Sequence, residues 1–172
     1  RLFEISLSSA RIVQFEDMPE FMVDRLGLTV EQRFFKRLFD IVLSLLGIIV
    51  TSPLMIFVAI LIRSTSKGPA IYKQTRITVG NREFRMLKFR TMYVNAEDNT
   101  GPVLSSDDDP RITKVGRVLR NLRLDELPQL FNVLRGDMSF VGPRPERPFF
   151  VEQYSRDIPE YTHRYLVKAG MT

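Results

Sequence analysis

The chain has 172 residues and a formal net charge of +5, with no cysteine and a single histidine. This length is enough for one domain with a hydrophobic core, while the residue counts exclude a disulfide scaffold and a thiolate metal site and leave a hard, oxygen-bound cation such as Mg²⁺ as the plausible metal. The sequence pI of about 9.7 favours an anionic partner, which could be nucleic acid, anionic lipid or a phosphorylated substrate.

Charge divides the chain into distinct regions. The segment 1–35 is net acidic, the segment 41–62 has no charged residue, and the segments 63–90 and 111–123 are strongly basic. The first residue is not methionine and no signal-peptide pattern is present at the start, so we expect a piece of a longer protein. We predict a tail or linker over residues 1–33, a membrane helix over 34–62 and a further domain over 63–172.

The uncharged run has the length of a helix that spans a membrane, at about 1.5 Å of rise per residue. A spanning helix is the default interpretation, and a buried helix in a soluble core is the weakest. Pro53 favours a third, a re-entrant helix that bends and returns, because it breaks the hydrogen-bond ladder, where Ser52 could bond the carbonyl of Ile48. Cations flank both ends, which places both on the cytoplasmic side: Lys36, Arg37, Arg63, Lys67, Lys73 and Arg76.

Two short strands come after the apolar run. Residues 70–79 and 82–92 flank Gly80-Asn81, which is typical of a β-hairpin with a tight turn. The apolar positions change parity within the second strand, so we expect a β-bulge there. The residues that change parity are Phe84 and Met86 on one side and Leu87 and Phe89 on the other.

A polar stretch over 95–110 is predicted to be a loop, and an amphipathic helix comes after it over 112–122. This helix could expose its basic face to water in a soluble protein. The preceding apolar run favours the alternative, a helix lying on a membrane surface with its basic edge toward anionic head groups. The apolar set is Ile112, Val115, Val118, Leu119 and Leu122, and the basic set is Arg111, Lys114, Arg117 and Arg120.

The strongest candidate for chemistry is the sequence LDELPQL at 124–130. Because Pro128 is tolerated in the first turn of a helix, we predict Asp125 near the N-cap of a helix that runs through Leu134. The start of such a helix can bind phosphate, although Asp125 could also be a simple capping residue. Asp125 and Glu126 point about 100° apart on a helix, so spacing alone does not make them an acid–base pair.

Two prolines flank Arg144 in the sequence GPRPE. They stiffen the backbone on both sides of the arginine, which suits recognition of a phosphate by its guanidinium group. The alternative is a rigid surface loop with an incidental arginine. We assign no role to His163, the single histidine.

From Phe34 to Thr172 the sequence resembles the bacterial sugar transferases of the monotopic phosphoglycosyl transferase superfamily, the polyprenyl-phosphate glycosylphosphotransferases. The segment 1–33 resembles the stretch that joins an extra N-terminal region to this module in longer members. The family continues past Thr172 with further functional arginines, so we expect the catalytic domain to be incomplete at its C-terminus. The match is carried by FKRLFD at 35–40, Ser52-Pro53, KFRTM at 88–92, the block 123–146 and KAGMT at 168–172.

The resemblance implies an α+β, mainly helical fold: a re-entrant membrane helix with interfacial amphipathic helices and a small β-hairpin on the cytoplasmic face of the bacterial inner membrane. It implies transfer of a sugar-1-phosphate from a UDP-sugar to undecaprenyl phosphate, releasing UMP, at the start of exopolysaccharide, capsule or O-antigen synthesis. Inner-membrane phospholipids are the expected surroundings, nucleic acid is not an expected partner, and the oligomeric state stays open.

The resemblance also implies roles for individual residues. Asp125 would attack the phosphate bonded to the sugar, while Glu126 would orient a metal or handle a proton. Mg²⁺, or else Mn²⁺, would bind at these two carboxylates, and flanking cations with a helix dipole should keep Asp125 ionised. The candidate contacts for phosphate or a lipid head group are Arg144, Arg120, Lys88, Arg90 and Arg123.

Two other classes remain as alternatives. A membrane-anchored scaffold without catalysis would explain the apolar run but not the motifs around Asp125 and Arg144. A nucleic-acid-binding module would explain the basic residues, yet it would not need the apolar run, and the sequence contains no recognition motif for it.

Overall fold

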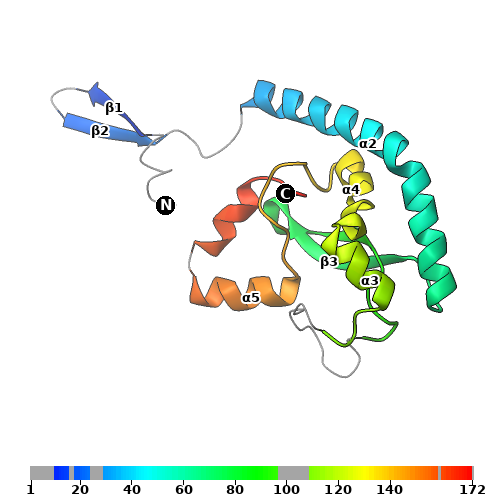
Figure 1. Cartoon of the computed structure of the whole chain (residues 1–172). Helices are drawn as coiled ribbons and strands as arrows, with labels where there is room; N and C mark the ends of the chain where they lie inside the picture. The colour runs from blue at the N-terminus through cyan, green and yellow to red at the C-terminus, as the bar shows by residue number, and fades with distance from the viewer. Residues whose placement is uncertain (1–9, 16–17, 24–28, 97–108, 159, 172) are drawn as a thin grey trace.

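The computed structural model describes residues 10–15, 18–23, 29–96, 109–158 and 160–171. Figure 1 shows one long helix arching over a small body that contains a β-hairpin and several short helices, so the expected mixed, mainly helical fold class is confirmed. In chain order the elements are β1 (Ala10–Phe15), β2 (Met18–Val23), α2 (Val30–Thr65), β3 (Ile71–Thr78), η1 (Val79–Asn81), β4 (Arg82–Phe89), α3 (Lys114–Asn121), η2 (Leu124–Glu126), α4 (Gln129–Arg135), α5 (Pro148–Asp157) and η3 (Tyr161–Leu166).

The hairpin near the N-terminus was not predicted. β1 pairs with β2 in an antiparallel ladder that runs from Ala10 opposite Val23 to Phe15 opposite Met18. The segment 1–33, expected to be a tail or linker, therefore contains regular structure within its described part.

Helix α2 begins earlier than predicted because a capping box fixes its start. The Thr29 hydroxyl accepts from the Gln32 backbone, and the Gln32 side chain accepts from Thr29 N–H. Pro53 lies within the helix, which bends in Figure 1. Ser52 donates to the carbonyl of Ile49 at 2.9 Å, not to that of Ile48 as predicted, because the Ile49 carbonyl is the one that Pro53 leaves without its helical partner.

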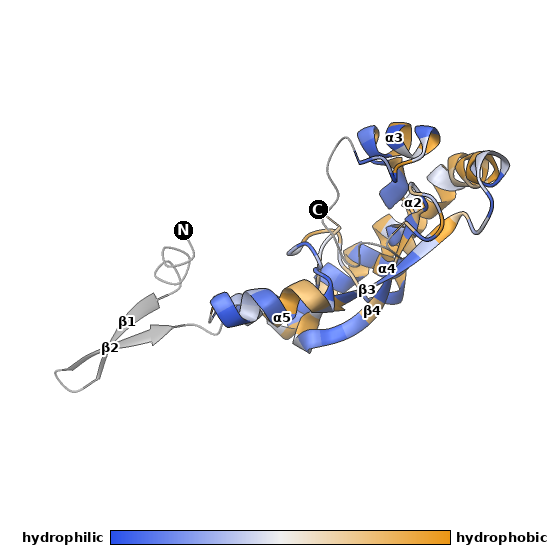
Figure 2. Cartoon of the chain, turned by 90° about the horizontal axis from the view of Figure 1, so that it is seen from below, coloured by the Kyte–Doolittle hydropathy of each residue, from blue (hydrophilic) through white to orange (hydrophobic). Residues whose placement is uncertain are grey.

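Most of α2 exposes large apolar side chains. Its most apolar 18-residue window has a mean hydropathy of 2.7 but is only 17% buried, and Figure 2 shows apolar residues along the helix. Ile49, Val50 and Ile60 are 61%, 76% and 62% exposed, whereas Asp40 and Ser44 are buried. This inverted pattern does not fit a helix in a soluble core, and it fits a helix in contact with lipid.

The body contacts α2 along most of its length. Near the start of the helix, Arg37 donates to the carbonyls of Val133 and Leu134, each at 2.7 Å. Near its end, Val58 and Ile62 pack into one apolar core cluster. We call this the anchor core; it comprises Met55, Val58, Ile62, Ala70, Phe89 and Leu119, with Ile48, Ala59, Ile71, Val115, Leu124 and Leu127 packed against it.

The β3–β4 hairpin pairs in continuous register from Ile71 opposite Phe89 to Thr78 opposite Arg82, so the predicted bulge is wrong. The change of parity has a different cause: β4 buries side chains on both of its faces. Phe89 enters the anchor core, while the opposite face buries a second cluster. That second cluster comprises Phe84, Met86, Val133, Met138 and Ala169, with Phe140 and Met171 packed against it.

One side chain of α4, that of Asn132, forms hydrogen bonds with the free edge of β4. Asn132 accepts from the backbone N–H of Leu87 at 2.9 Å and donates to the carbonyl of Arg85 at 2.8 Å. The Asn132 amide thereby continues the β-ladder as a neighbouring strand would. Its full burial fixes the position of α4 and of the turn that precedes it.

Helix α3 is shorter than the predicted helix over 112–122. It begins after Thr113, whose hydroxyl accepts a backbone hydrogen bond at 2.9 Å, and Ile112 instead forms a β-bridge with Met92. Leu119 is buried in the anchor core, and most of the predicted loop over 95–110 lies outside the described residues. Apolar and basic side chains share the exposed surface of this region: Val118, Leu122, Lys114 and Arg117.

Candidate functional site

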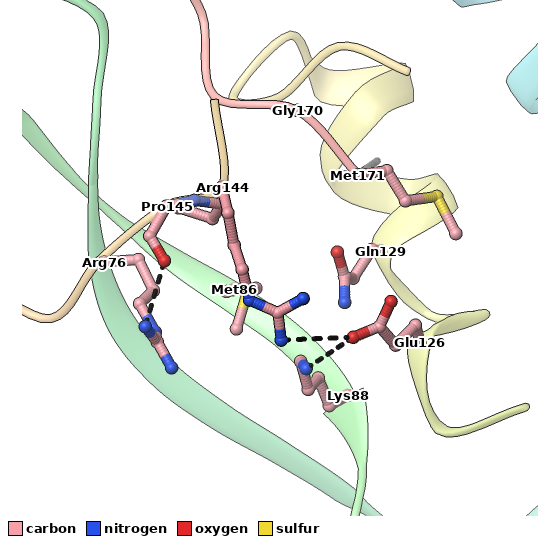
Figure 3. A pocket seen from close by; sticks show the side chains of 9 residues that line it. All are labelled: Arg76, Met86, Lys88, Glu126, Gln129, Arg144, Pro145, Gly170 and Met171. Carbon is pink, nitrogen blue, oxygen red and sulfur yellow. Dashed lines mark hydrogen bonds and ion pairs between the residues drawn. The ribbon is translucent and has the colours of Figure 1, made fainter. Parts of the chain in front are cut away.

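A polar pocket opens on the face of the hairpin that lies opposite the anchor core (Figure 3). Three further segments complete it: the turn η2 with the start of α4, the loop around Arg144, and the C-terminal segment. The residues that line it are Arg76, Met86, Lys88, Glu126, Gln129, Arg144, Pro145, Gly170 and Met171.

Glu126 lies between two cations in this pocket. Lys88 donates to Glu126 Oε1 at 2.9 Å, and Arg144 Nη2 lies 3.7 Å from the same oxygen (Figure 3). Lys88 reaches the pocket because alternate residues of β4 share a face, which it shares with Met86. Three of the predicted site residues therefore meet, although they come from segments far apart in the sequence.

The turn that carries Asp125 and Glu126 is held by its neighbours. Leu124 and Leu127 pack against the anchor core, so the two acids between them are fixed beside β4. The predicted helix from Asp125 through Leu134 is wrong in its first part: a 3₁₀ turn ends at Glu126, and α4 starts after Pro128. Pro128 has no N–H to donate and therefore begins the new helix.

Asp125 is buried and is not among the residues that line the pocket. Burial raises the pKa of its carboxyl group above the ordinary value, and the negative charge of Glu126 adds to this effect. The positive charges of Lys88 and Arg120 act in the opposite direction but do not outweigh burial. Of the flanking cations that we expected to act on Asp125, Arg120 does lower its pKa, yet desolvation is the larger effect and sets the direction of the shift.

Hydrogen bonds hold the backbone at each residue from 143 to 146. The carbonyls of residues 143 to 146 each accept a hydrogen bond, between 2.6 and 3.0 Å, from a different part of the fold. The Arg144 side chain itself is 68% exposed. The rigid frame predicted from the two prolines is thus supplemented by four bonds, whose donors are Gly170 N, Arg164 Nη2, Arg76 Nη1 and Ile77 N.

Two polar residues of the pocket were missed by the sequence analysis. Arg76 lies on the pocket face of β3 and is held by Gln74 Oε1 at 2.6 Å and by the carbonyl of Pro145 at 2.9 Å. Burial lowers the pKa of its guanidinium group, a direction that Glu146 opposes. Gln129 is buried at the start of α4. Alternation along β3 could have indicated Arg76, whereas Gln129 had no signal beyond its place in the LDELPQL motif.

Three other predicted contacts do not line the pocket. Arg90 is buried and binds the carbonyls of Ser66 and Lys67, each at 2.9 Å, at the end of α2. Arg120 donates to the hydroxyl of Thr91 at 3.0 Å. Arg123 is exposed in the left-handed backbone region, with a φ of 55°.

The chain matches the family model described as bacterial sugar transferase over residues 31–172. Over 139 residues it is 49% identical to the UDP-N-acetylgalactosamine-undecaprenyl-phosphate N-acetylgalactosaminephosphotransferase of Aeromonas hydrophila, a match that covers 81% of this chain and 33% of that relative.

Two further relatives carry the name UDP-glucose:undecaprenyl-phosphate glucose-1-phosphate transferase. The Caulobacter vibrioides protein is 45% identical over 137 residues, which is 80% of this chain and 51% of the relative. The Escherichia coli protein is 37% identical over 171 residues, which is 99% of this chain and 37% of the relative. The chain therefore spans between a third and about half of the length of these three relatives.

Proposed function

This chain belongs to the bacterial sugar transferase family, and from that premise we propose that it transfers a sugar-1-phosphate from a UDP-sugar to undecaprenyl phosphate, releasing UMP. The product would start a surface polysaccharide such as exopolysaccharide, capsule or O-antigen. Because the relatives' names specify both N-acetylgalactosamine and glucose, the identity of the sugar stays open.

One observation carries this proposal: a pocket with three cations lies directly beside a pair of adjacent carboxylates. Arg76, Lys88 and Arg144 line it, and a diphosphate is the kind of ligand that such a cluster attracts. Glu126 is held between two of these cations, so a bound diphosphate would lie within reach of the turn that carries Asp125.

The proposed chemistry has two steps. A carboxylate oxygen of Asp125 attacks the phosphorus that bears the sugar, and the bond from this phosphorus to the bridging oxygen breaks, so UMP leaves with that oxygen and its electron pair. An oxygen of undecaprenyl phosphate then attacks the same phosphorus, and the Asp125 carboxylate leaves. Each step replaces one P–O bond by another, so neither an oxidant nor a base is needed.

The environment of Asp125 suits this role. A carboxylate removed from water has lost part of the hydration shell that would shield it, which favours attack once the substrate is bound. Lys88 and Arg144 would offset negative charge that develops on the departing UMP. Glu126 would orient a metal or handle a proton, and its pairing with Lys88 is compatible with either role.

The donor atoms of the site fit Mg²⁺ only when substrate takes part. Within the described residues no group of three or more acidic, histidine or cysteine side chains could hold a metal ion. Asp125 and Glu126 would supply oxygen ligands, and the phosphates of the substrate would complete the shell. When bound, Mg²⁺ would neutralise charge on the diphosphate and on UMP.

We also propose that α2 is a re-entrant helix with both ends on the cytoplasmic face of the inner membrane. Polar contacts at Arg37 and Asp40 and apolar contacts at Val58 and Ile62 join both halves of α2 to the same body. If α2 spanned the bilayer, the body would have to extend through it with these polar groups. The exposed residues of α3 would then lie at the head-group layer.

Cysteine labelling in intact cells tests this topology. This part of the protein contains no cysteine, so within it Val30→Cys and Lys67→Cys each introduce a single label site. A membrane-impermeant reagent should reach neither site from the periplasm and both sites in inverted vesicles. Labelling of the two sites from opposite sides would contradict the re-entrant helix.

The reaction is tested by incubating the full-length protein with a panel of UDP-sugars, Mg²⁺ and undecaprenyl phosphate. We expect UMP release with one or a few of the sugars, and only when the lipid is present for repeated turnover. Absence of UMP release with every sugar in the panel would contradict the proposed function.

A further inference from the structure

We propose that Arg164 is a positioning residue for Arg144: it fixes the backbone from which the Arg144 side chain reaches the phosphates of the donor. The inference rests on the proposed function, because it assumes that Arg144 contacts the donor. Arg164 lies in η3, 20 residues further along the chain, and it does not line the pocket.

Arg164 is held in place by two aromatic rings. Its Nη1 donates to the hydroxyl of Tyr161 at 2.5 Å, and its guanidinium carbon lies 4.9 Å from the centre of the Tyr161 ring and 5.8 Å from that of Tyr165. Such contacts attract a cation and restrict its rotation. From this fixed position, Nη2 donates to the carbonyl of Arg144 at 2.6 Å.

The backbone of Arg144 matters because little else directs its side chain. The side chain is largely exposed, and its ion pair with Glu126 is long, at 3.7 Å. A mobile, solvated guanidinium loses conformational entropy when it binds a phosphate, whereas a fixed backbone reduces that loss. The direction of the main chain at Arg144 therefore limits where the guanidinium can reach.

Among the four groups that fasten residues 143–146, Arg164 is the one best suited to a test. Gly170 and Ile77 use backbone N–H groups, which only a proline would remove, and proline would also change the backbone itself. Arg76 also lines the pocket, so its loss would remove a cation from the site itself. Arg164 does not line the pocket and its side chain donates to the carbonyl of Arg144, so its substitution tests positioning without removing a cation from the site.

The two tyrosines that hold Arg164 are partly removed from water. Burial raises the pKa of the Tyr165 hydroxyl to about 12, and burial also raises that of Tyr161. A tyrosine of ordinary pKa is already uncharged at neutral pH, and the raised values extend the uncharged range of both rings to more alkaline pH.

Hydrogen exchange of the full-length protein tests the contact without reference to activity. In Arg164→Ala, peptides that contain residues 142–147 should exchange faster than in the wild type, while peptides from α2 and β4 should be unchanged. The matched control is Arg156→Ala, which removes an exposed arginine paired with Glu152 on α5. Unchanged exchange of the loop in Arg164→Ala would overturn the proposal.

Steady-state kinetics then separate positioning from a merely structural role. We expect Arg164→Ala to raise the KM for the UDP-sugar on the order of tenfold, with kcat changed by no more than about twofold, since it weakens binding to ground and transition states alike. Arg164→Lys, which keeps one donor, should recover part of the loss. A lower kcat with an unchanged KM would indicate only loss of folded protein and would overturn the proposal.

A double-mutant cycle asks whether Arg164 acts through Arg144. Adding Arg164→Ala to Arg144→Ala should raise the KM no further, whereas additive effects would contradict positioning. Failure of the proposed function can be recognised separately. If the wild type releases no UMP with any UDP-sugar, the proposed reaction is contradicted. The hydrogen-exchange comparison then decides by itself whether Arg164 holds the loop.

Discussion

Neighbouring residues of β4 point their side chains to opposite faces of the hairpin. Lys88 points into a pocket lined by charged groups, whereas Phe89 enters the anchor core beneath α2. The first face is held by hydrogen bonds and ion pairs around Glu126 and Arg144, and the second by apolar packing. The pocket and the anchor core thus lie on opposite faces of one strand pair, and a change in the anchor core that leaves Leu124 and Leu127 packed should leave the pocket intact.

The turn η2 is where the two faces meet. Leu124 and Leu127 pack on the anchor core, while Glu126, between them in sequence, lines the pocket. The anchor core therefore fixes where the turn with Asp125 and Glu126 lies relative to α2. The phosphate of a lipid substrate lies at the head-group layer of the membrane. If α2 is in the membrane, its packing against η2 would hold the proposed nucleophile at that same depth, where donor and acceptor can both reach it.

The largest effect is expected on the pocket face. Asp125→Asn retains the shape of the side chain but removes the attacking charge, so turnover should fall on the order of 10³-fold or more. The thermal unfolding temperature should not fall, because burial opposes the ionised form of Asp125 and the neutral amide avoids that cost. UMP release and thermal unfolding measure the two effects. Near-normal turnover would show that Asp125 is not the nucleophile.

Removal of divalent cations should also act on the pocket face alone. After exhaustive EDTA treatment we expect UMP release to stop and to return on addition of Mg²⁺ or Mn²⁺, since the phosphate charge is otherwise not neutralised. The unfolding temperature without substrate should change little, because the described residues contain no metal site of their own. Full activity after EDTA treatment would refute the metal requirement.

The anchor face should respond in stability and not in substrate affinity. Ile62 is 2% exposed, so Ile62→Ala should lower the free energy of unfolding in detergent by about 2–5 kcal/mol. Ile60, two residues earlier and 62% exposed, provides the matched control and should cost far less as Ile60→Ala. Denaturant unfolding and the KM for the UDP-sugar are measured for both. A raised KM in Ile62→Ala would show that the two faces are not independent.

The smallest effect concerns pH. Because the pKa of Asp125 is raised, its carboxylate becomes protonated at a higher pH than an ordinary aspartate, and the nucleophile is lost as the pH falls through that raised value. The acid limb of kcat/KM in the wild type should therefore lie above about pH 3.9, the reference value for aspartate. An acid limb below that value would mean that the cations outweigh burial.

The sequence predicted the elements that local patterns determine. The strands of the β3–β4 hairpin, the long apolar helix and the approximate position of α3 follow from turn residues, hydropathy and helical periodicity. The importance of Asp125, Glu126 and Arg144 came mainly from the resemblance to a family, since the local pattern of each also had a simpler structural explanation.

The remaining features depend on contacts between distant segments. The parity change in β4 suggested a bulge because the sequence does not show that both faces are covered. Arg90, expected to bind phosphate, instead binds carbonyls at the end of α2. Arg76 and Arg164 reach the loop around Arg144 only because β3 and η3 lie beside it in the fold. The burial of Asp125 is likewise not readable from its local sequence.

The most direct test of the central claim is to trap the covalent intermediate. Wild-type protein given a UDP-sugar and Mg²⁺, but no lipid acceptor, should gain the mass of one sugar-phosphate group, and digestion should locate it on the peptide that contains Asp125. Addition of undecaprenyl phosphate should remove the added mass. Formation of the same adduct by Asp125→Asn, or kinetics that require donor and acceptor to bind together before UMP leaves, would contradict Asp125 as the nucleophile.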